Sequence, residues 1–167
     1  MRILYLTGFM GVGKSAAGRT LARRLGRSFV DLDAAVERAA GASIMEVFAR
    51  RGEKTFRRLE REALARAAKR RGAVVALGGG TLLDARNRAV VARTGVLVRL
   101  TCSRRELVRR LRSQRASHPL LAGGALDARV AFLLRARRAA CADAGITVST
   151  TGLSTAAVAS LIARRLT

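Results

Sequence analysis

The residues best suited to chemistry lie in one glycine-rich stretch near the amino terminus. Gly8-Phe9-Met10-Gly11-Val12-Gly13-Lys14-Ser15 follows the P-loop pattern, in which a glycine and four further residues precede Gly-Lys-Ser. Glycines let the backbone wrap closely around phosphate oxygens, and the following helix start points its N–H groups at the anion. Lys14 would neutralise the β- and γ-phosphates, and the Ser15 hydroxyl would bind Mg²⁺. The residues predicted to bind ATP are Gly11, Val12, Gly13, Lys14, Ser15 and Ala16.

A second group of chemical interest is Asp31-Leu32-Asp33. The apolar run Ala73 to Leu77 leads into three glycines without a carboxylate, so an acid for the metal has to come from elsewhere. If residues 28–32 form a strand, alternate side chains face the same way, and both carboxylates can project toward one site beside the P-loop. One would serve Mg²⁺ and the other the acceptor hydroxyl. Asp33 is equally suited to a solvated helix N-cap, and spacing alone does not decide.

The elements that must position these groups alternate between strands and helices. Such alternation predicts an α/β fold, a single-domain three-layer α/β/α arrangement with a five-stranded parallel sheet. The expected strands are Arg2 to Thr7, Ser28 to Leu32, Ala73 to Leu77, Val96 to Leu100 and Ile146 to Ser149. The expected helices are Lys14 to Leu25 (ended by Gly26), Asp33 to Ala40, Ser43 to Arg51, Glu53 to Arg71, Asp84 to Arg93, a helix opened by a Ser103/Glu106 capping box, Leu126 to Ala142 and Ser154 to Arg165.

Length and composition bound the class of protein. The 167 residues, half of them apolar, suit one folded domain over 1–167. The apolar runs are too short to span a bilayer and no signal peptide is visible, so we expect a cytoplasmic protein without a membrane partner. Cys102 and Cys141 have no metal-like spacing and are expected to be free thiols.

The formal charge of +22 raises the possibility of a nucleic-acid partner. The arginines, however, are spread along nearly every expected helix, and the chain has no tryptophan and one tyrosine on which bases could stack. We therefore expect a solvated basic surface, with no specific nucleic acid bound, that attracts anions such as nucleotides and acidic metabolites.

Taken together, the motifs of this chain resemble those of the shikimate kinase family of P-loop folds. The resemblance covers most of the chain in family order. Its residues are the P-loop, Asp31-Leu32-Asp33, Gly41-Ala42-Ser43-Ile44, Gly52 to Glu60, Gly78-Gly79-Gly80 and Pro119-Leu120-Leu121-Ala122-Gly123.

The resemblance implies a role for each matching residue. Asp31 would hold Mg²⁺ through water, and Asp33 would bind the acceptor's ring hydroxyls and help to deprotonate the attacking oxygen. Arg57 would clamp the substrate carboxylate with two parallel hydrogen bonds, oriented by Glu60 one helical turn on. The remaining implied substrate contacts are Gly78, Gly79, Gly80 and Arg137. Without the family context, Arg57 and Arg137 would be read as surface charges.

Two departures from the family pattern stand out. Before the Pro-Leu-Leu of the expected mobile lid, about residues 113–124, the family usually carries an arginine that reaches the transferring phosphate, whereas this chain has His118. A histidine is shorter and mostly neutral at cytoplasmic pH, so Arg115 is a candidate to reach the phosphate in its place. After Arg137 the family's Pro-Leu-Tyr is replaced by Ala139-Ala140-Cys141.

The resemblance implies a kinase that uses ATP and Mg²⁺ to phosphorylate the 3-hydroxyl of shikimate, with its acceptor-binding helical segment at about residues 33–62. We expect it to be a monomer. Two alternatives stay open from sequence. One is a related P-loop kinase acting on another cyclitol or sugar acid. The other is a nucleotide-binding protein with low turnover.

Overall fold

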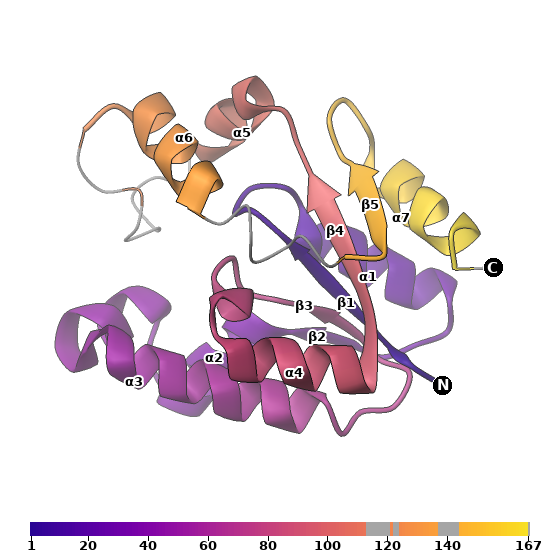
Figure 1. The fold of residues 1–167 in the computed structure, drawn as a ribbon, viewed down its shortest axis with the longest axis horizontal. Helices are drawn as coiled ribbons and strands as arrows, with labels where there is room; N and C mark the ends of the chain where they lie inside the picture. The colour runs from indigo at the N-terminus through magenta and orange to yellow at the C-terminus, as the bar shows by residue number, and fades with distance from the viewer. Residues whose placement is uncertain (113–120, 122–123, 137–143, 167) are drawn as a thin grey trace.

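A computed structural model describes residues 1–112, 121, 124–136 and 144–166 of the chain. Five parallel strands form one sheet in the order β2-β3-β1-β4-β5 (Figure 1). The strands are β1 (Ile3–Gly8), β2 (Phe29–Asp31), β3 (Val74–Ala76), β4 (Gly95–Thr101) and β5 (Ile146–Ser149). The predicted α/β class and five-stranded parallel sheet are confirmed.

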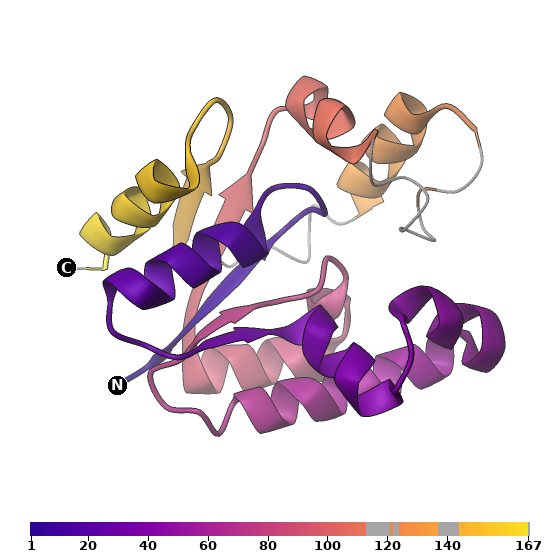
Figure 2. The ribbon, with the colours of Figure 1, turned by 180° about the vertical axis from the view of Figure 1, so that it is seen from behind.

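Helices cover both faces of this sheet. They are α1 (Lys14–Arg24), α2 (Leu32–Ala40), α3 (Ile44–Ala67), α4 (Ala85–Thr94), α5 (Arg104–Leu111), α6 (Leu126–Ala136) and α7 (Thr155–Arg164), with a short 3₁₀ helix η1 (Thr81–Leu83). In Figure 2 α1 and α7 lie on the near face, and α3 and α4 lie together across the sheet from them. Among the described residues, no helix is long and apolar enough to cross a membrane.

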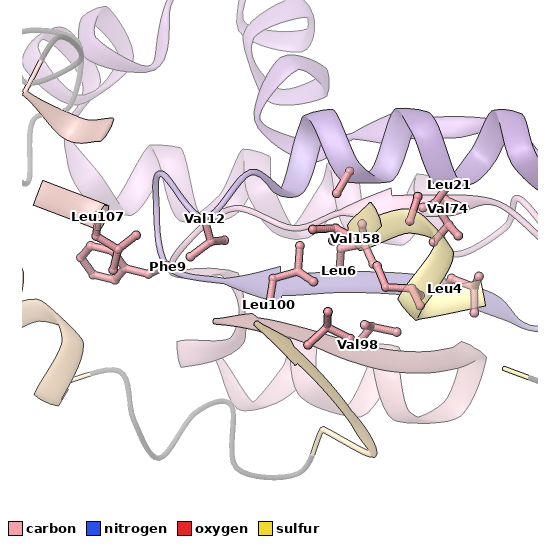
Figure 3. Close-up of a cluster of buried hydrophobic side chains, with 14 of the residues drawn as sticks. Leu4, Leu6, Phe9, Val12, Leu21, Val74, Val98, Leu100, Leu107 and Val158 are labelled. Atoms are coloured by element: carbon pink, nitrogen blue, oxygen red, sulfur yellow. The ribbon is translucent and has the colours of Figure 1, made fainter. Parts of the chain in front are cut away.

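Two hydrophobic cores hold the three layers together, and β1 contributes to both. Its six residues are all buried, as expected for a central parallel strand. Because side chains alternate along a strand, Leu4 and Leu6 pack toward α1 and α7, whereas Ile3 and Tyr5 pack toward α3 and α4. Figure 3 shows the first of these cores, where side chains of α1 and α7 meet those of β1, β3 and β4.

Several helix boundaries differ from the sequence prediction. Gly52 has φ 74° and ψ 167°, so it separates two helical pieces as expected, but they follow one another closely enough to form α3. Helix α3 ends at Ala67 rather than Arg71, since the chain must turn through Gly72 (φ 76°) to enter β3. The expected extension of the helix after Leu126 beyond Ala136 lies outside the described residues.

The predicted capping box at α5 is only half formed. Ser103 Oγ accepts a hydrogen bond from the Glu106 N–H at 3.3 Å. The Glu106 carboxylate, however, accepts from Arg109 and Arg110, and the Ser103 N–H donates to Thr151 Oγ1. Two arginines within reach compete successfully for the glutamate that would otherwise complete the box.

Candidate active site

The glycine-rich loop joins β1 to α1, as the motif predicted. Gly8, Gly11 and Gly13 have φ values of 145°, 78° and 91°, which side-chain-bearing residues rarely adopt. At Gly8 a Cβ would also lie 2.4 Å from the Leu100 carbonyl oxygen. Lys14 crosses the loop, and its Nζ donates to the carbonyl oxygens of Gly8 and Phe9 at 2.9 and 3.0 Å.

The start of α1 is suited to an anion. Its N-cap is Gly13 in a left-handed conformation, and no side chain caps the helix there. The first N–H groups of a helix carry partial positive charge and point outward along the axis. The backbone at Lys14, Ser15 and Ala16 therefore presents the arrangement that binds phosphate in P-loops.

A cleft of about 750 Å³ opens beside this helix start and contains most of the sequence-predicted residues. It is bounded by the P-loop, by α2 and α3 and by the loop that follows β3. Its lining includes the following predicted residues: Gly11, Gly13, Lys14, Ser15, Ala16, Asp31, Asp33, Arg57, Gly78, Gly79 and Gly80. Val12 does not line the cleft, because its side chain is buried in the hydrophobic core beneath the loop (Figure 3).

Asp31 and Asp33 reach the cleft by a route other than the predicted one. The strand ends at Asp31, and Asp33 lies in the first turn of α2, so strand alternation does not explain their shared side. The N-cap of α2 is Asp31, not Asp33: its Oδ1 accepts from the Ala34 N–H at 3.3 Å. Asp33 is therefore not needed to cap the helix.

Burial raises the pKa of the Asp33 carboxyl to about 6, from an ordinary value of 3.8. The ammonium of Lys14 opposes this shift, but three nearby carboxylates add to it, those of Asp31, Glu60 and Glu37. A carboxylate with a pKa near 6 is still ionised at pH 7 and is a stronger base than an ordinary aspartate. This is the property needed to accept a proton from a hydroxyl.

Arg57 is held by two carboxylates on its own helix. Its Nη1 donates to Glu60 Oε2 at 2.9 Å, and its Nη2 donates to Glu53 Oε1 at 3.2 Å. Burial disfavours the charged form, but these ion pairs outweigh it and raise the pKa of Arg57 above its ordinary value. The predicted orientation of Arg57 by Glu60 is thus present in the geometry, and Glu53 adds a second contact.

The glycines after β3 fit closely against these side chains. A Cβ on Gly78 would lie 2.6 Å from Asp33 Oδ1 and 2.9 Å from Glu60 Oε1. A Cβ on Gly80 would lie 3.0 Å from Arg57 Nη2. The space that these glycines leave is therefore filled by the side chains of the cleft itself, so larger residues would displace Asp33 or Arg57.

The oxygen groups near the P-loop fit a magnesium ion. The Ser15 hydroxyl and the Asp31 carboxylate both line the cleft, and both are hard oxygen ligands of the kind Mg²⁺ prefers. The described residues contain no cluster of three or more His, Cys, Asp or Glu that could hold a metal on its own. Mg²⁺ at nucleotide sites commonly takes only one or two protein ligands together with phosphate oxygens and water.

Some residues that line the cleft were not predicted. Glu37 accepts from the Ile44 N–H at 3.1 Å and so ties α2 to the start of α3. Arg110 of α5 reaches back to the P-loop, where its Nη1 donates to the Gly11 carbonyl at 3.3 Å. Its Nε also donates to Glu106 at 2.9 Å. In a chain with so many arginines, no sequence signal distinguished Arg110 from its neighbours.

Three predicted site residues lie outside the described residues: Arg115, His118 and Arg137. The expected lid at 113–124 lies there too, except for Leu121 and Gly124. Leu121 is fully buried in the same core cluster as Phe9 and Leu107. The roles of Arg115, His118 and Arg137 therefore stay predictions.

The parallel sheet, the P-loop and the carboxylate beside it define a P-loop kinase. The family model for shikimate kinase matches residues 10–167, which is most of the chain. The chain belongs to the shikimate kinase family.

Individual relatives agree with this assignment. A shikimate kinase of Geobacter sulfurreducens is 44% identical over 162 residues, covering 97% of this chain and 89% of that protein. One from Geobacter metallireducens is 43% identical over 154 residues, covering 92% of this chain and 86% of the relative. Among solved structures, the shikimate kinase of Acinetobacter baumannii in complex with shikimate superposes with a TM-score of 0.95 at 32% identity, covering 99% and 93% of the two chains.

Proposed function

We propose that this protein transfers the γ-phosphoryl group of ATP to the 3-hydroxyl of shikimate, giving shikimate 3-phosphate and ADP. One observation carries the proposal. A phosphate-binding helix start, a carboxylate with a raised pKa and a carboxylate-held arginine all line one cleft. Shikimate carries ring hydroxyls and one carboxylate, so it can engage the last two groups together.

Each end of the acceptor has a partner in the cleft. Arg57 would bind the carboxylate through parallel N–H bonds, an arrangement that favours an acid over a neutral sugar. Asp33 would accept a hydrogen bond from the attacking hydroxyl and take its proton as the new P–O bond forms and the bond to ADP breaks. Gly78, Gly79 and Gly80 would support the ring between these two contacts.

The nucleotide would be held mainly by backbone. The N–H groups of residues 11–16 would bind the phosphates, and Lys14 would turn from the loop carbonyls toward the β- and γ-phosphate oxygens. Mg²⁺, held by Ser15 and through water by Asp31, would neutralise charge on those oxygens. Arg115 and His118 would act on the transferring phosphate, and Arg137 on the carboxylate.

The direct test is ADP release from Mg·ATP by the purified protein, with and without shikimate. Release should depend strongly on shikimate and give shikimate 3-phosphate, identified by mass. Quinate and gluconate serve as comparison hydroxy acids, because they share the carboxylate but not the ring geometry. ADP release that shikimate does not stimulate would contradict the proposal and favour another hydroxy acid or a nucleotide-binding role.

We also propose that the protein works in the cytoplasm, where ATP is abundant, and as a monomer. Size-exclusion chromatography with light scattering checks the second point: a stable dimer at assay concentration would contradict it.

A further inference from the structure

At the wall of the cleft lies a group of buried polar side chains: Glu60 contacts Arg57, whereas Thr81 and Asn87 have no part in the proposed reaction. Glu60, Thr81 and Asn87 are 1%, 0% and 2% exposed. They belong to three different elements, α3, η1 and α4. Polar groups at this depth are rare unless they are hydrogen-bonded to each other, so their partners indicate what they do.

Hydrogen bonds connect the three residues in a chain. Thr81 Oγ1 donates to Glu60 Oε1 at 2.6 Å. Asn87 Nδ2 donates to the Thr81 carbonyl oxygen at 2.9 Å. The Thr81 N–H donates to the Gly78 carbonyl at 3.2 Å, which closes the turn after β3. Thr81 is therefore bonded through its side chain, its carbonyl and its N–H at once.

The hydroxyl of Thr81 determines how Glu60 can point. Glu60 has two carboxylate oxygens: Oε1 accepts from Thr81, and Oε2 accepts from Arg57 at 2.9 Å. A carboxylate bound at only one oxygen can rotate about its last bond, whereas one bound at both cannot. With Oε1 held, Oε2 stays directed at Arg57.

Thr81 also borders the loop of Gly78, Gly79 and Gly80, which is proposed to contact the acceptor. A Cβ on Gly78 would lie 3.0 Å from Thr81 Oγ1 and 2.9 Å from Glu60 Oε1. Thr81 thus packs behind Gly78 while Gly80 packs against Arg57. Both surfaces that would contact the acceptor, the guanidinium and the glycine loop, depend on the position of one buried residue.

We propose that Thr81 is a positioning residue for acceptor binding: its hydroxyl locks Glu60, which in turn presents Arg57 to the acceptor carboxylate, and Asn87 holds Thr81 in place. The proposal rests on the proposed function for the identity of the acceptor. It predicts that Thr81 affects the binding of the acid and leaves nucleotide binding unchanged, since none of these contacts reaches the P-loop.

The test compares Thr81→Val, which removes the hydroxyl at nearly constant shape, with Thr81→Ser, which keeps it. Loss of a hydrogen bond to a buried charged group should raise the KM for shikimate about 10-fold in Thr81→Val. The KM for ATP and kcat should stay within about twofold, and Thr81→Ser should restore the KM for shikimate. Asn87→Leu should act in the same direction with a smaller effect.

Thr94→Val is the matched control. Thr94 also donates a hydroxyl bond, which is partly buried, to the Val90 carbonyl at 2.7 Å, and it contacts the Tyr5 hydroxyl at 2.8 Å. It lies at the opposite end of α4 from the cleft. It should lower thermal stability without changing the KM for shikimate. Equal changes in both KM values in Thr81→Val, or a rise in the KM for shikimate in Thr94→Val as large as in Thr81→Val, would overturn the proposal.

A second measurement judges the positioning role independently of the acceptor. The guanidinium N–H signals of Arg57, assigned by their loss in Arg57→Lys, should exchange slowly with water in the wild type and in Thr81→Ser. They should broaden in Thr81→Val. Unchanged signals would refute the role of Thr81 whatever the substrate, whereas broadened signals in a protein that ignores shikimate would refute only the proposed function.

Discussion

The nucleotide half of the cleft is made mainly of backbone, whereas the acceptor half is made mainly of side chains. Around the P-loop, positive-φ glycines and an uncapped helix start provide the anion site, with Lys14 as its main charged side chain. Around Asp33 and Arg57, the site depends on ion pairs and buried hydrogen bonds from separate elements.

This difference has a physical cause and a consequence for mutation. A phosphate presents the same oxygens in every nucleotide, so backbone N–H groups suffice for it. An acid with ring hydroxyls needs a base and a carboxylate clamp at fixed separation, which only oriented side chains supply. Substitutions on the nucleotide side should therefore affect kcat most, and those on the acceptor side should divide between kcat and KM.

Replacing Lys14 by alanine should have the largest effect. It removes the cation proposed to neutralise developing charge on the transferring group, so kcat should fall roughly 1,000-fold or more. Circular dichroism and melting temperature should remain near those of the wild type. Lys54→Ala, a change at an exposed lysine, is the control and should keep full activity. Near-normal turnover in Lys14→Ala would contradict the proposal that the P-loop side of the cleft controls kcat.

Asp33→Asn should lower kcat roughly 100- to 1,000-fold, because an amide cannot accept the proton. The same variant should melt at a higher temperature. Since the folded pKa of about 6 exceeds 3.8, ionised Asp33 weakens folding, and its contribution becomes less favourable as pH rises from about 3.8 to about 6. A neutral side chain removes that penalty at pH 7.

Asp127→Asn provides the matched control for this change, since Asp127 is exposed on α6. It should alter neither kcat nor the melting temperature appreciably. A lower melting temperature for Asp33→Asn would show that Asp33 stabilises the fold, contrary to the raised pKa.

Arg57→Ala should raise the KM for shikimate roughly 10- to 100-fold, the range for losing a charge-assisted hydrogen-bond pair. The KM for ATP should change little. Arg58→Ala is the neighbouring control: its side chain is 58% exposed and pairs with Glu62, whereas that of Arg57 is 21% exposed. Steady-state kinetics on both variants decide the point, and equal effects on the two substrates would count against a carboxylate clamp.

The pH dependence is the smallest and most diagnostic effect. Above pH 6 Asp33 is mainly ionised and able to accept a proton, and below it the carboxyl is mainly neutral. The kcat/KM for shikimate should therefore fall about tenfold per pH unit below pH 6. The residual activity of Asp33→Asn should lack this limb. A wild-type profile that is flat between pH 5 and 7 would exclude Asp33 as the base.

The difference between backbone-built and side-chain-built parts of the cleft also explains which features could be predicted from the sequence. The P-loop, the five strands and the glycines at Gly26 and Gly52 follow from local rules, because a turn, a cap or a buried strand depends on neighbouring residues. Spacing left Asp33 open as a helix N-cap or as a site residue, and the N-cap of α2 is Asp31, since Asp, Leu and Asp in succession offer two equivalent starts. Tertiary packing selects between them.

Most of what sequence missed involves partners distant in the chain. Nothing local to Thr81 indicates that its hydroxyl meets Glu60, or that Arg110 reaches Gly11. Such contacts depend on how the helices and strands pack against one another. In a chain with 33 basic residues, no local sequence feature distinguishes one arginine from the others. Motifs therefore predicted the groups proposed to react, whereas the residues that orient them emerged only from the three-dimensional arrangement.

The kink at Gly52 has a consequence for how acceptor specificity can change. The helical piece from Ile44 to Arg51 lies between Gly41 and Gly52, which both have positive φ, and of its residues only Val47 is buried. Ile44, Met45 and Phe48 nonetheless line the cleft. Ile44 and Phe48 also pack against the core, so exposed positions such as Met45 are the ones that can change at little cost to it. Substitutions in this piece can therefore alter which acceptor binds, while the P-loop and its phosphate site stay unchanged.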